Sequence, residues 1–205
     1  MRKVQNAEQG FSLLETLVVI GIMAILSSIA IFKSFGTTES YKANSAMDIV
    51  VSQMRVARQL AISQRRNVQV SFNTAVTPPQ IIYTVQAGNY TGSTELNGTP
   101  VTMQLPTQVQ FTSESGETDT PMAFGTCGSN FGVCIASLSG GPAIMGFNSE
   151  GQFTDSTWVN TLNGTIFIGI PAQPATARAV TVMGGTGRVR SYSYAGGTGA
   201  YAWTE

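Results

Sequence analysis

Residues 10–32 read GFSLLETLVVIGIMAILSSIAIF, and this stretch governs how the rest of the chain is interpreted. Residues 13–32 carry a single charge, that of Glu15. A helix of that length spans about 30 Å, which matches the apolar core of a bilayer. Arg2 and Lys3 precede the stretch, so the positive-inside rule keeps the N-terminus in the cytoplasm. The pattern predicts a transmembrane helix over 11–32.

A small residue in front of the apolar run indicates where a leader would be removed. An ordinary secretory signal is cleaved behind small residues that follow its apolar region. Here the obvious small residue, Gly10, comes before that region. Cleavage at Gly10 would release a short basic leader, residues 1–10, and would leave the apolar helix attached to the mature protein.

The sequence GFSLLE at residues 10–15, followed by an apolar helix, resembles the prepilin motif of type IV pilins and type II secretion pseudopilins. The resemblance implies that a prepilin peptidase cuts between Gly10 and Phe11 and methylates the new N-terminal Phe11. Glu15 then occupies the fifth mature position, where the family has its glutamate. The resemblance also implies a pilin-like fold and assembly into a pilus or pseudopilus by an inner-membrane platform.

Glu15 is a charge within an apolar helix, and such a residue usually has a partner or a role. Within one subunit, the nearest candidate partner is the Phe11 ammonium that cleavage creates one helical turn away. In a filament, the ammonium of a neighbouring subunit could pair with Glu15 and set the stagger between helices, as buried polar residues set register in coiled coils. The alternative is that Glu15 lies close enough to the membrane interface to be tolerated.

The composition excludes much catalytic chemistry. The formal net charge is zero, so bulk electrostatics indicates no partner, and there is no histidine to act as a general base or metal ligand. We therefore expect no enzymatic activity, no cofactor and no metal site. Carboxylates that could pair for glycoside chemistry are not grouped by any motif; they are Glu114, Glu117, Asp119, Glu150 and Asp155.

The two cysteines, Cys127 and Cys134, allow three interpretations. A zinc half-site would need further Cys or His ligands, which the chain lacks. A redox pair more usually has two residues between its cysteines and stands beside a βαβ pattern. A structural disulfide is the interpretation we favour, and it implies an oxidising compartment outside the cytoplasm.

Helical periodicity continues beyond the apolar stretch. No proline interrupts residues 11–66, so we expect one long helix there, with Gly21 and Gly36 as soft spots. Its amphipathic part, residues 33–66, is expected to pack on a globular head through an apolar stripe on one face. The stripe consists of Ala43, Met47, Val50, Met54, Ala57 and Ala61.

From residue 67 onward the pattern changes to strands and turns. NVQVSF at 67–72 and IIYTVQ at 81–86 predict a hairpin. Residues 67–205 therefore form a β-rich domain outside the cytoplasm, and the chain is predicted to be α+β, with the helix covering one face of a mostly antiparallel sheet. The further strands are expected at Val101–Leu105, Val109–Thr112, Ala143–Phe147, Thr165–Ile170, Ala179–Met183 and Arg188–Tyr194.

Three segments of the head extend the resemblance from the N-terminal motif to one subgroup of the family. They are SQMRVARQLAISQRRNVQVSF at 52–72, FNSEGQF at 147–153 and ARAVTVMGGTGRVR at 177–190. Together they are similar to the head domain of H-type minor pseudopilins (GspH) and of related minor pilins such as FimT and FimU. The likeness covers roughly half the chain and leaves out the loop-rich region from Tyr90 to Ser139.

The charges are divided between two regions. Basic residues outnumber acidic ones in 33–66, and the reverse holds in 67–205. This indicates either ordinary solvated faces or complementary packing between neighbouring subunits.

The segment GRVR at 187–190 resembles the GRxR element of DNA-binding FimT-type minor pilins. Arg188 and Arg190 would share one face of a strand and could bind neighbouring phosphates. Four aromatic residues follow that could stack on bases; they are Tyr192, Tyr194, Tyr201 and Trp203. An acidic head opposes the binding of a polyanion, so nucleic acid is not the favoured partner.

Three hypotheses follow. The favoured one is a structural subunit, minor in type, of a type IV pilus or type II secretion pseudopilus. Its partners would be sibling subunits, the prepilin peptidase, the assembly platform and, before assembly, membrane lipid. Its location would be the bacterial inner membrane with the head in the periplasm, and then the fibre. The others are a minor pilin that captures DNA through Arg188 and Arg190, and an anchored protein that never assembles.

Overall fold

The computed structural model describes residues 12–86, 98–113, 124, 133–135, 145–196 and 203–205, with the backbone alone at 30–37 and 135. The chain divides into two compact units, Met1–Thr38 and Glu39–Glu205. The second unit carries all the strands of the described residues and is called the head.

The helix α1 extends over Leu13–Gln64, and the expectation of one long helix is confirmed. It continues through Gly21 and Gly36 without a break. Two backbone hydrogen bonds close its C-terminal end. Arg66 N–H donates to the Ala61 carbonyl at 3.1 Å, and Arg65 N–H donates to the Ile62 carbonyl at 3.3 Å. Arg65 takes a left-handed conformation, φ 51°, so this end has the pattern of a Schellman motif.

In the part of the head that the structure describes, the first sheet has five strands in the order β3-β2-β1-β5-β6. The predicted hairpin is confirmed, because β1 and β2 pair antiparallel from Val68↔Val85 to Asn73↔Gln80. The strand bounds are β1 Val68–Asn73, β2 Gln80–Val85, β3 Val101–Gln104, β5 Met145–Phe147 and β6 Phe153–Thr154.

The second sheet also has five strands among the described residues, in the order β10-β9-β8-β7-β4, and each of these neighbouring pairs is antiparallel. The expectation of a single sheet was therefore wrong. Local alternation predicts strands but says nothing about which of them pair. The bounds are β4 Val133–Ile135, β7 Gly164–Ile168, β8 Arg178–Met183, β9 Arg188–Tyr194 and β10 Trp203–Thr204, with a short 3₁₀ helix η2 at Pro174–Thr176.

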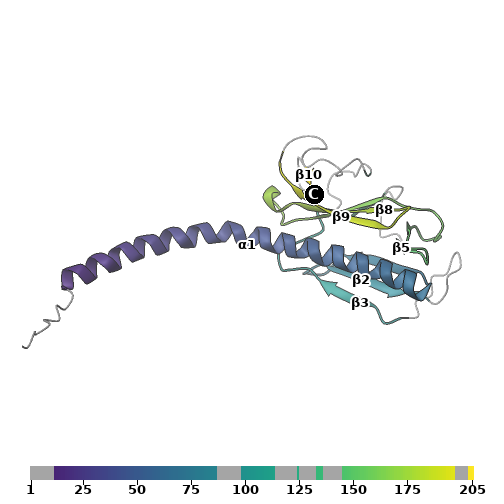
Figure 1. Ribbon diagram of the computed structural model, residues 1–205, viewed down its shortest axis with the longest axis horizontal. Helices are drawn as coiled ribbons and strands as arrows, with labels where there is room; N and C mark the ends of the chain where they lie inside the picture. The colour runs from purple at the N-terminus through teal and green to yellow at the C-terminus, as the bar shows by residue number, and fades with distance from the viewer. Residues whose placement is uncertain (1–11, 87–97, 114–123, 125–132, 136–144, 197–202) are drawn as a thin grey trace, which may run out of the picture. The chain divides into compact units, whose positions relative to one another are not determined.

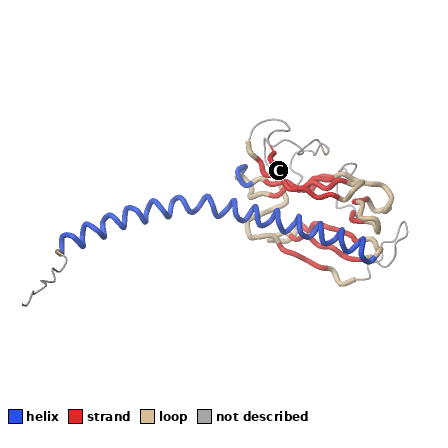
Figure 2. Tube along the Cα trace, viewed as in Figure 1, coloured by secondary structure: helices blue, strands red, loops and turns tan. Residues whose placement is uncertain are grey.

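The main core lies between both sheets and the part of α1 that belongs to the head, residues 39–64, which is called the head part of α1. In Figure 1 this part of the helix has β2 and β3 on one side and β8 and β9 on the other, and Figure 2 shows strands on both sides of it. The predicted apolar stripe faces this core, since Val50, Met54 and Ala61 are fully buried. They pack in one cluster with Val68 of the first sheet and Val180 of the second.

A second, smaller cluster covers the opposite face of the second sheet. It contains Phe167, Ala177, Ala179, Tyr192 and Trp203. Because both faces of β8 are covered, the five residues from Arg178 to Val182 are all buried. This explains why β8 reads as a nearly continuous apolar run rather than as an alternating one.

The predicted strand at Val109–Thr112 is wrong. Val109 and Phe111 are buried while Gln110 is exposed, so the side chains alternate as in a strand. The backbone, however, forms only one isolated bridge, in which Gln110 and Gly169 exchange bonds of 2.8 and 3.0 Å. The strands β4, β6 and β10 were missed; each has two or three residues, too few for a periodicity to appear.

Candidate processing and assembly site

The predicted cleavage site, Gly10 and Phe11, lies outside the described residues. The described chain begins at Ser12, whose carbonyl accepts hydrogen bonds from Thr16 N–H at 3.1 Å and Thr16 Oγ1 at 3.0 Å. Glu15 is in the first turn of α1, where the helix dipole favours a negative charge. The carboxylate therefore has a local electrostatic reason for its position, which the sequence reasoning did not consider.

The segment of α1 from Leu13 to Ile29 exposes apolar side chains all round. Their exposed fractions range from 47% at Val19 to 83% at Leu13. A helix that is apolar on every side is usually covered by lipid or by other helices, because its surface is unfavourable in water. The exposed large apolar residues here are Leu13, Leu14, Leu17, Val18, Val19, Ile20, Ile22, Met23, Ile25, Leu26 and Ile29.

The predicted transmembrane helix over 11–32 is not confirmed. In the part of the chain that the structure describes, no helix is both long enough and apolar enough to cross a membrane.

Arg188 and Arg190 lie on β9, two residues apart, and therefore on the same face of the second sheet. Arg188 is exposed. Arg190 is half-buried and forms an ion pair with Glu205, with 3.0 Å between Nη1 and Oε2. A hydrogen bond with Tyr192, together with the charge of Glu205, raises the pKa of Arg190. One of the two predicted phosphate ligands is thus already neutralised by a carboxylate.

The aromatic residues predicted to stack on bases are mostly not accessible. Tyr192 is 3% exposed and Trp203 is 6% exposed, and both belong to the smaller apolar cluster. Tyr194 is half-buried and contacts Trp203 edge to face, with ring centroids 5.2 Å apart. The interpretation of Tyr192 and Trp203 as a base-stacking platform was wrong, because these rings fill a core; Tyr201 lies outside the described residues.

Gly187, which begins the GRVR segment, has a packing role. It adopts φ +62°, and a Cβ at this position would overlap the Gly151 carbonyl oxygen and lie 2.7 Å from Arg58 Nε. Arg58 Nε itself donates to that carbonyl at 3.1 Å. The turns at 148–151 and 183–187 therefore meet the last turns of α1 at this point, called below the Arg58 contact (Arg58, Gly151 and Gly187).

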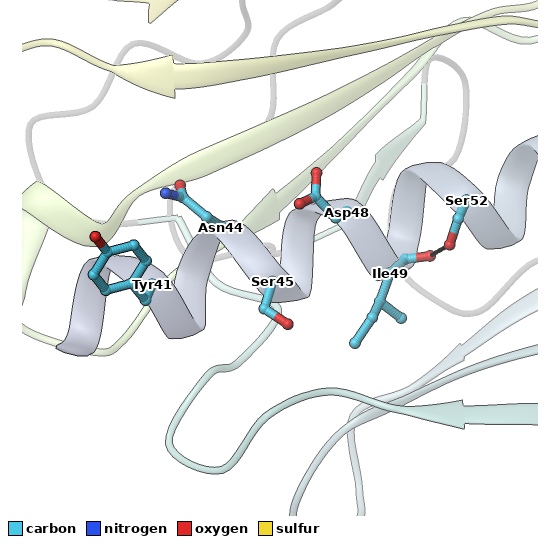
Figure 3. A pocket seen from close by; sticks show the side chains of 6 residues that line it. All are labelled: Tyr41, Asn44, Ser45, Asp48, Ile49 and Ser52. Atoms are coloured by element: carbon cyan, nitrogen blue, oxygen red, sulfur yellow. Dashed lines mark hydrogen bonds between the residues drawn. The ribbon is translucent and has the colours of Figure 1, made fainter. Parts of the chain in front are cut away.

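A solvent-facing hollow lies along the head part of α1, and the sequence reasoning did not anticipate it (Figure 3). Tyr41 is 72% exposed there, and Asn44 and Asp48 point to one side of the helix while Ser45 and Ile49 point to the other. Asn44 is engaged, because its Oδ1 accepts a 2.7 Å hydrogen bond from Arg178 Nε. The lining residues are Tyr41, Asn44, Ser45, Asp48, Ile49 and Ser52.

The remaining predicted residues do not form a reactive site in the described part. Cys127 lies outside it, so the disulfide stays a prediction; Cys134 is on β4, and no described cysteine is free. Glu114, Glu117 and Asp119 also lie outside it, and no group of His, Cys, Asp or Glu among the described residues could hold a metal ion. Two of these acids lie inside it. Asp155 accepts the Thr157 backbone N–H at 2.9 Å, and Glu150 lies in a turn, where its own backbone N–H donates to Asn148 Oδ1 at 3.1 Å.

The comparisons with known proteins concern the N-terminal segment. The family model described as the prokaryotic N-terminal methylation motif matches residues 5–31. No curated protein and no solved structure matches the chain. The matched residues include Gly10, Phe11 and Glu15 together with the whole of the exposed apolar segment, Leu13 to Ile29. The motif supports the pilin and pseudopilin family and indicates a type IV pilin-like subunit that a prepilin peptidase processes.

Proposed function

We propose that this chain is a minor structural subunit of a type IV pilus or a type II secretion pseudopilus. A prepilin peptidase removes residues 1–10 and methylates Phe11, and the mature chain assembles through its N-terminal helix. The observation that carries the proposal is the methylation motif over residues 5–31, which coincides with a helix segment whose apolar side chains have no cover within the described chain.

The exposed apolar segment of α1 has to be covered both before and after the subunit joins a fibre. Before assembly, lipid of the inner membrane covers it while the head stands in the periplasm. After assembly, the helices of sibling subunits replace the lipid, because a helix that is apolar on all sides is unfavourable in water. The inner-membrane assembly platform transfers the subunit from the first environment to the second.

Glu15 sets the offset between neighbouring helices in this proposal. Cleavage at Gly10 leaves an ammonium on Phe11, and a neighbouring subunit can offer that charge to Glu15 in surroundings of low dielectric constant. Two charges in such surroundings are costly to leave unpaired, so the helices favour the one axial position at which the carboxylate and the ammonium meet. The helix dipole explains why a carboxylate is tolerated in the first turn, and the ammonium explains what it binds in the fibre.

Leader removal is tested by the mass of the native protein. We expect the mature chain to begin at a methylated Phe11, and Gly10→Ala to leave residues 1–10 in place. Gly21→Ala is the matched control, since an added Cβ there meets no atom within 4 Å and the leader should still be removed. A native chain that retains its first ten residues would refute the proposal.

Assembly is tested separately with Glu15→Gln, which keeps the size of the side chain and removes its charge. We expect normal leader removal and normal recovery in the membrane fraction, but little of the variant in sheared fibres. Glu39→Gln, a second acidic position on the same helix, should assemble normally. Equal incorporation of the two variants would contradict the role given to Glu15. Quantitative mass spectrometry of the same fibres gives the copy number, which is low for a minor subunit.

A further inference from the structure

The head part of α1 has a face that the core does not cover, and its exposed residues recur at steps of four and three. Figure 3 shows the portion of this face that lines the hollow. The spacing repeats every seven residues, as the contact positions of paired helices do. The residues that follow it are called the outward stripe, and they are Tyr41, Ser45, Asp48, Ser52, Arg55 and Gln59.

Two opposite charges stand seven residues apart on the outward stripe. Asp48 and Arg55 are both exposed, and among the described residues neither has an oppositely charged group within 4.0 Å. Seven residues of helix rise by about 10 Å, which is too far for the two side chains of one copy to form an ion pair. Both charges are therefore open to a partner from outside the chain.

A second copy of this chain supplies both partners if its helix lies parallel to the first and is displaced by seven residues. Arg55 of the second copy then lies opposite Asp48 of the first, and Ser52 lies opposite Ser45. Without the displacement, Asp48 would face Asp48 and Arg55 would face Arg55, and like charges opposite each other are unfavourable. The charges therefore favour the displaced arrangement over the one in register.

The apolar residues beside the outward stripe fit the same displacement. Val56 of the second copy, 41% exposed in the single chain, comes opposite the half-buried Ile49 of the first. Tyr41, which is 72% exposed, comes opposite Asp48 of the second copy, and a tyrosine hydroxyl can donate to a carboxylate. One displacement thus joins acid to base, apolar to apolar and a small side chain to a small side chain.

We propose that the outward stripe binds the outward stripe of a second copy of this chain, parallel to it and displaced by seven residues. The two copies use different residues of the stripe, so the contact can be repeated from one copy to the next. The parallel orientation rests on the proposed function, in which all copies are anchored in one membrane; the charge pattern does not. Two copies added in succession are enough to form the contact, which is therefore compatible with a low copy number.

A contact between two exposed helix faces is small, and its members need to be held near each other to bind. The experiment therefore uses two tagged forms of the full chain, mixed in detergent with several copies per micelle. One form carries Ser45→Cys and the other carries Ser52→Cys, and a short thiol cross-linker joins them. We expect the mixed product, position 45 to position 52, to exceed the product that joins position 52 to position 52 at least fivefold. The unaltered chain gives the background from Cys127 and Cys134.

Charge reversal tests the ion pair through the yield of the mixed product. Asp48→Arg alone, or Arg55→Asp alone, places like charges opposite each other and should lower the yield about fivefold. Both reversals in one chain restore the pair with its signs exchanged, so the yield should return to within about twofold of the original. Arg188→Asp reverses an exposed charge on β9, is the matched control, and should leave the yield unchanged.

Four results would overturn the proposal. They are a mixed product no more abundant than the background, a dominant product between two positions 52, as pairing in register or antiparallel gives, single reversals without effect, and a double reversal that does not restore the yield. The mass of the processed chain is independent of all four, so failure here is distinguishable from failure of the proposed function.

Discussion

Gly187→Ala gives the sharpest test of how the head is held together. A left-handed conformation costs a residue with a Cβ about 1–2 kcal/mol. The added Cβ would also overlap the Gly151 carbonyl and crowd Arg58 Nε at 2.7 Å, which displaces the guanidinium from its 3.1 Å bond. A hydrogen bond from a charged group contributes about 1.5–3 kcal/mol. The free energy of unfolding should therefore fall by about 3 kcal/mol or more.

The assay is thermal unfolding followed by circular dichroism on the full chain in detergent. For a domain of 150–250 residues, 1 kcal/mol corresponds to about 2–4 °C, so the midpoint should fall by about 6–12 °C. Gly185→Ala, two residues away in the same turn, meets no atom within 4 Å and has no left-handed backbone, so its midpoint should stay within about 2 °C. If the two alanine variants unfold at the same temperature, Gly187 has no packing role and the Arg58 contact does not stabilise the head.

Three further changes probe other parts of the head. Arg178→Lys should lower the free energy of unfolding, measured with urea, by about 2–4 kcal/mol, because Arg178 donates to Asn44 at 2.7 Å and to two backbone carbonyls. Arg188→Lys, at an exposed position on β9, is the control and should change this free energy by less than about 0.5 kcal/mol. Trp203→Ala should cost about 3–5 kcal/mol by emptying the smaller cluster; an unchanged urea midpoint would show that β10 is not packed there. Burial raises the pKa of Asp155, but hydrogen bonds from Thr157 and Asn160 outweigh burial and hold this pKa below its ordinary value of 3.8. The ionised carboxylate therefore adds to the free energy of unfolding above pH 3.8, and this stabilisation is lost as the pH falls through the lowered pKa. Asp155→Asn should therefore flatten the urea midpoint measured between pH 2.5 and 5, and an unchanged pH profile would contradict this.

The parts of the fold that could be predicted are those that local patterns specify. The β1–β2 hairpin follows from two alternating runs around a turn, and β9 was predicted with its observed bounds, Arg188–Tyr194, because glycines mark the turn before it. The division into two sheets could not be predicted, since strand pairing joins residues that are far apart in the chain. The segment Val109–Thr112 was wrongly predicted as a strand for a related reason. Its side chains alternate between buried and exposed, but its backbone forms an isolated bridge, Gln110↔Gly169, and no ladder with a described strand.

The candidate sites show the same distinction. The processing motif is a contiguous stretch, so the motif could be predicted from the sequence, and the family model of the N-terminal methylation motif matches residues 5–31; cleavage at Gly10 stays a prediction. The Arg190–Glu205 ion pair joins residues fifteen positions apart, and nothing local predicts it. The burial of Tyr192 depends on Phe167 and Trp203, which belong to other strands, so an aromatic residue beside two arginines resembled a ligand surface although it fills a core.

The small residues on the core side of α1 limit the size of any side chain that can replace them. Ala46 and Ala61 are fully buried and Ala57 is 1% exposed, and all three touch the cluster shared by the two sheets. Replacement by glycine loses one methyl group, but replacement by valine or leucine inserts volume where two layers already meet the helix. In a library covering every substitution at these three positions, the variants that fold should have side chains no larger than that of alanine. A variant that folds with a larger side chain should also have a smaller residue on the facing strand.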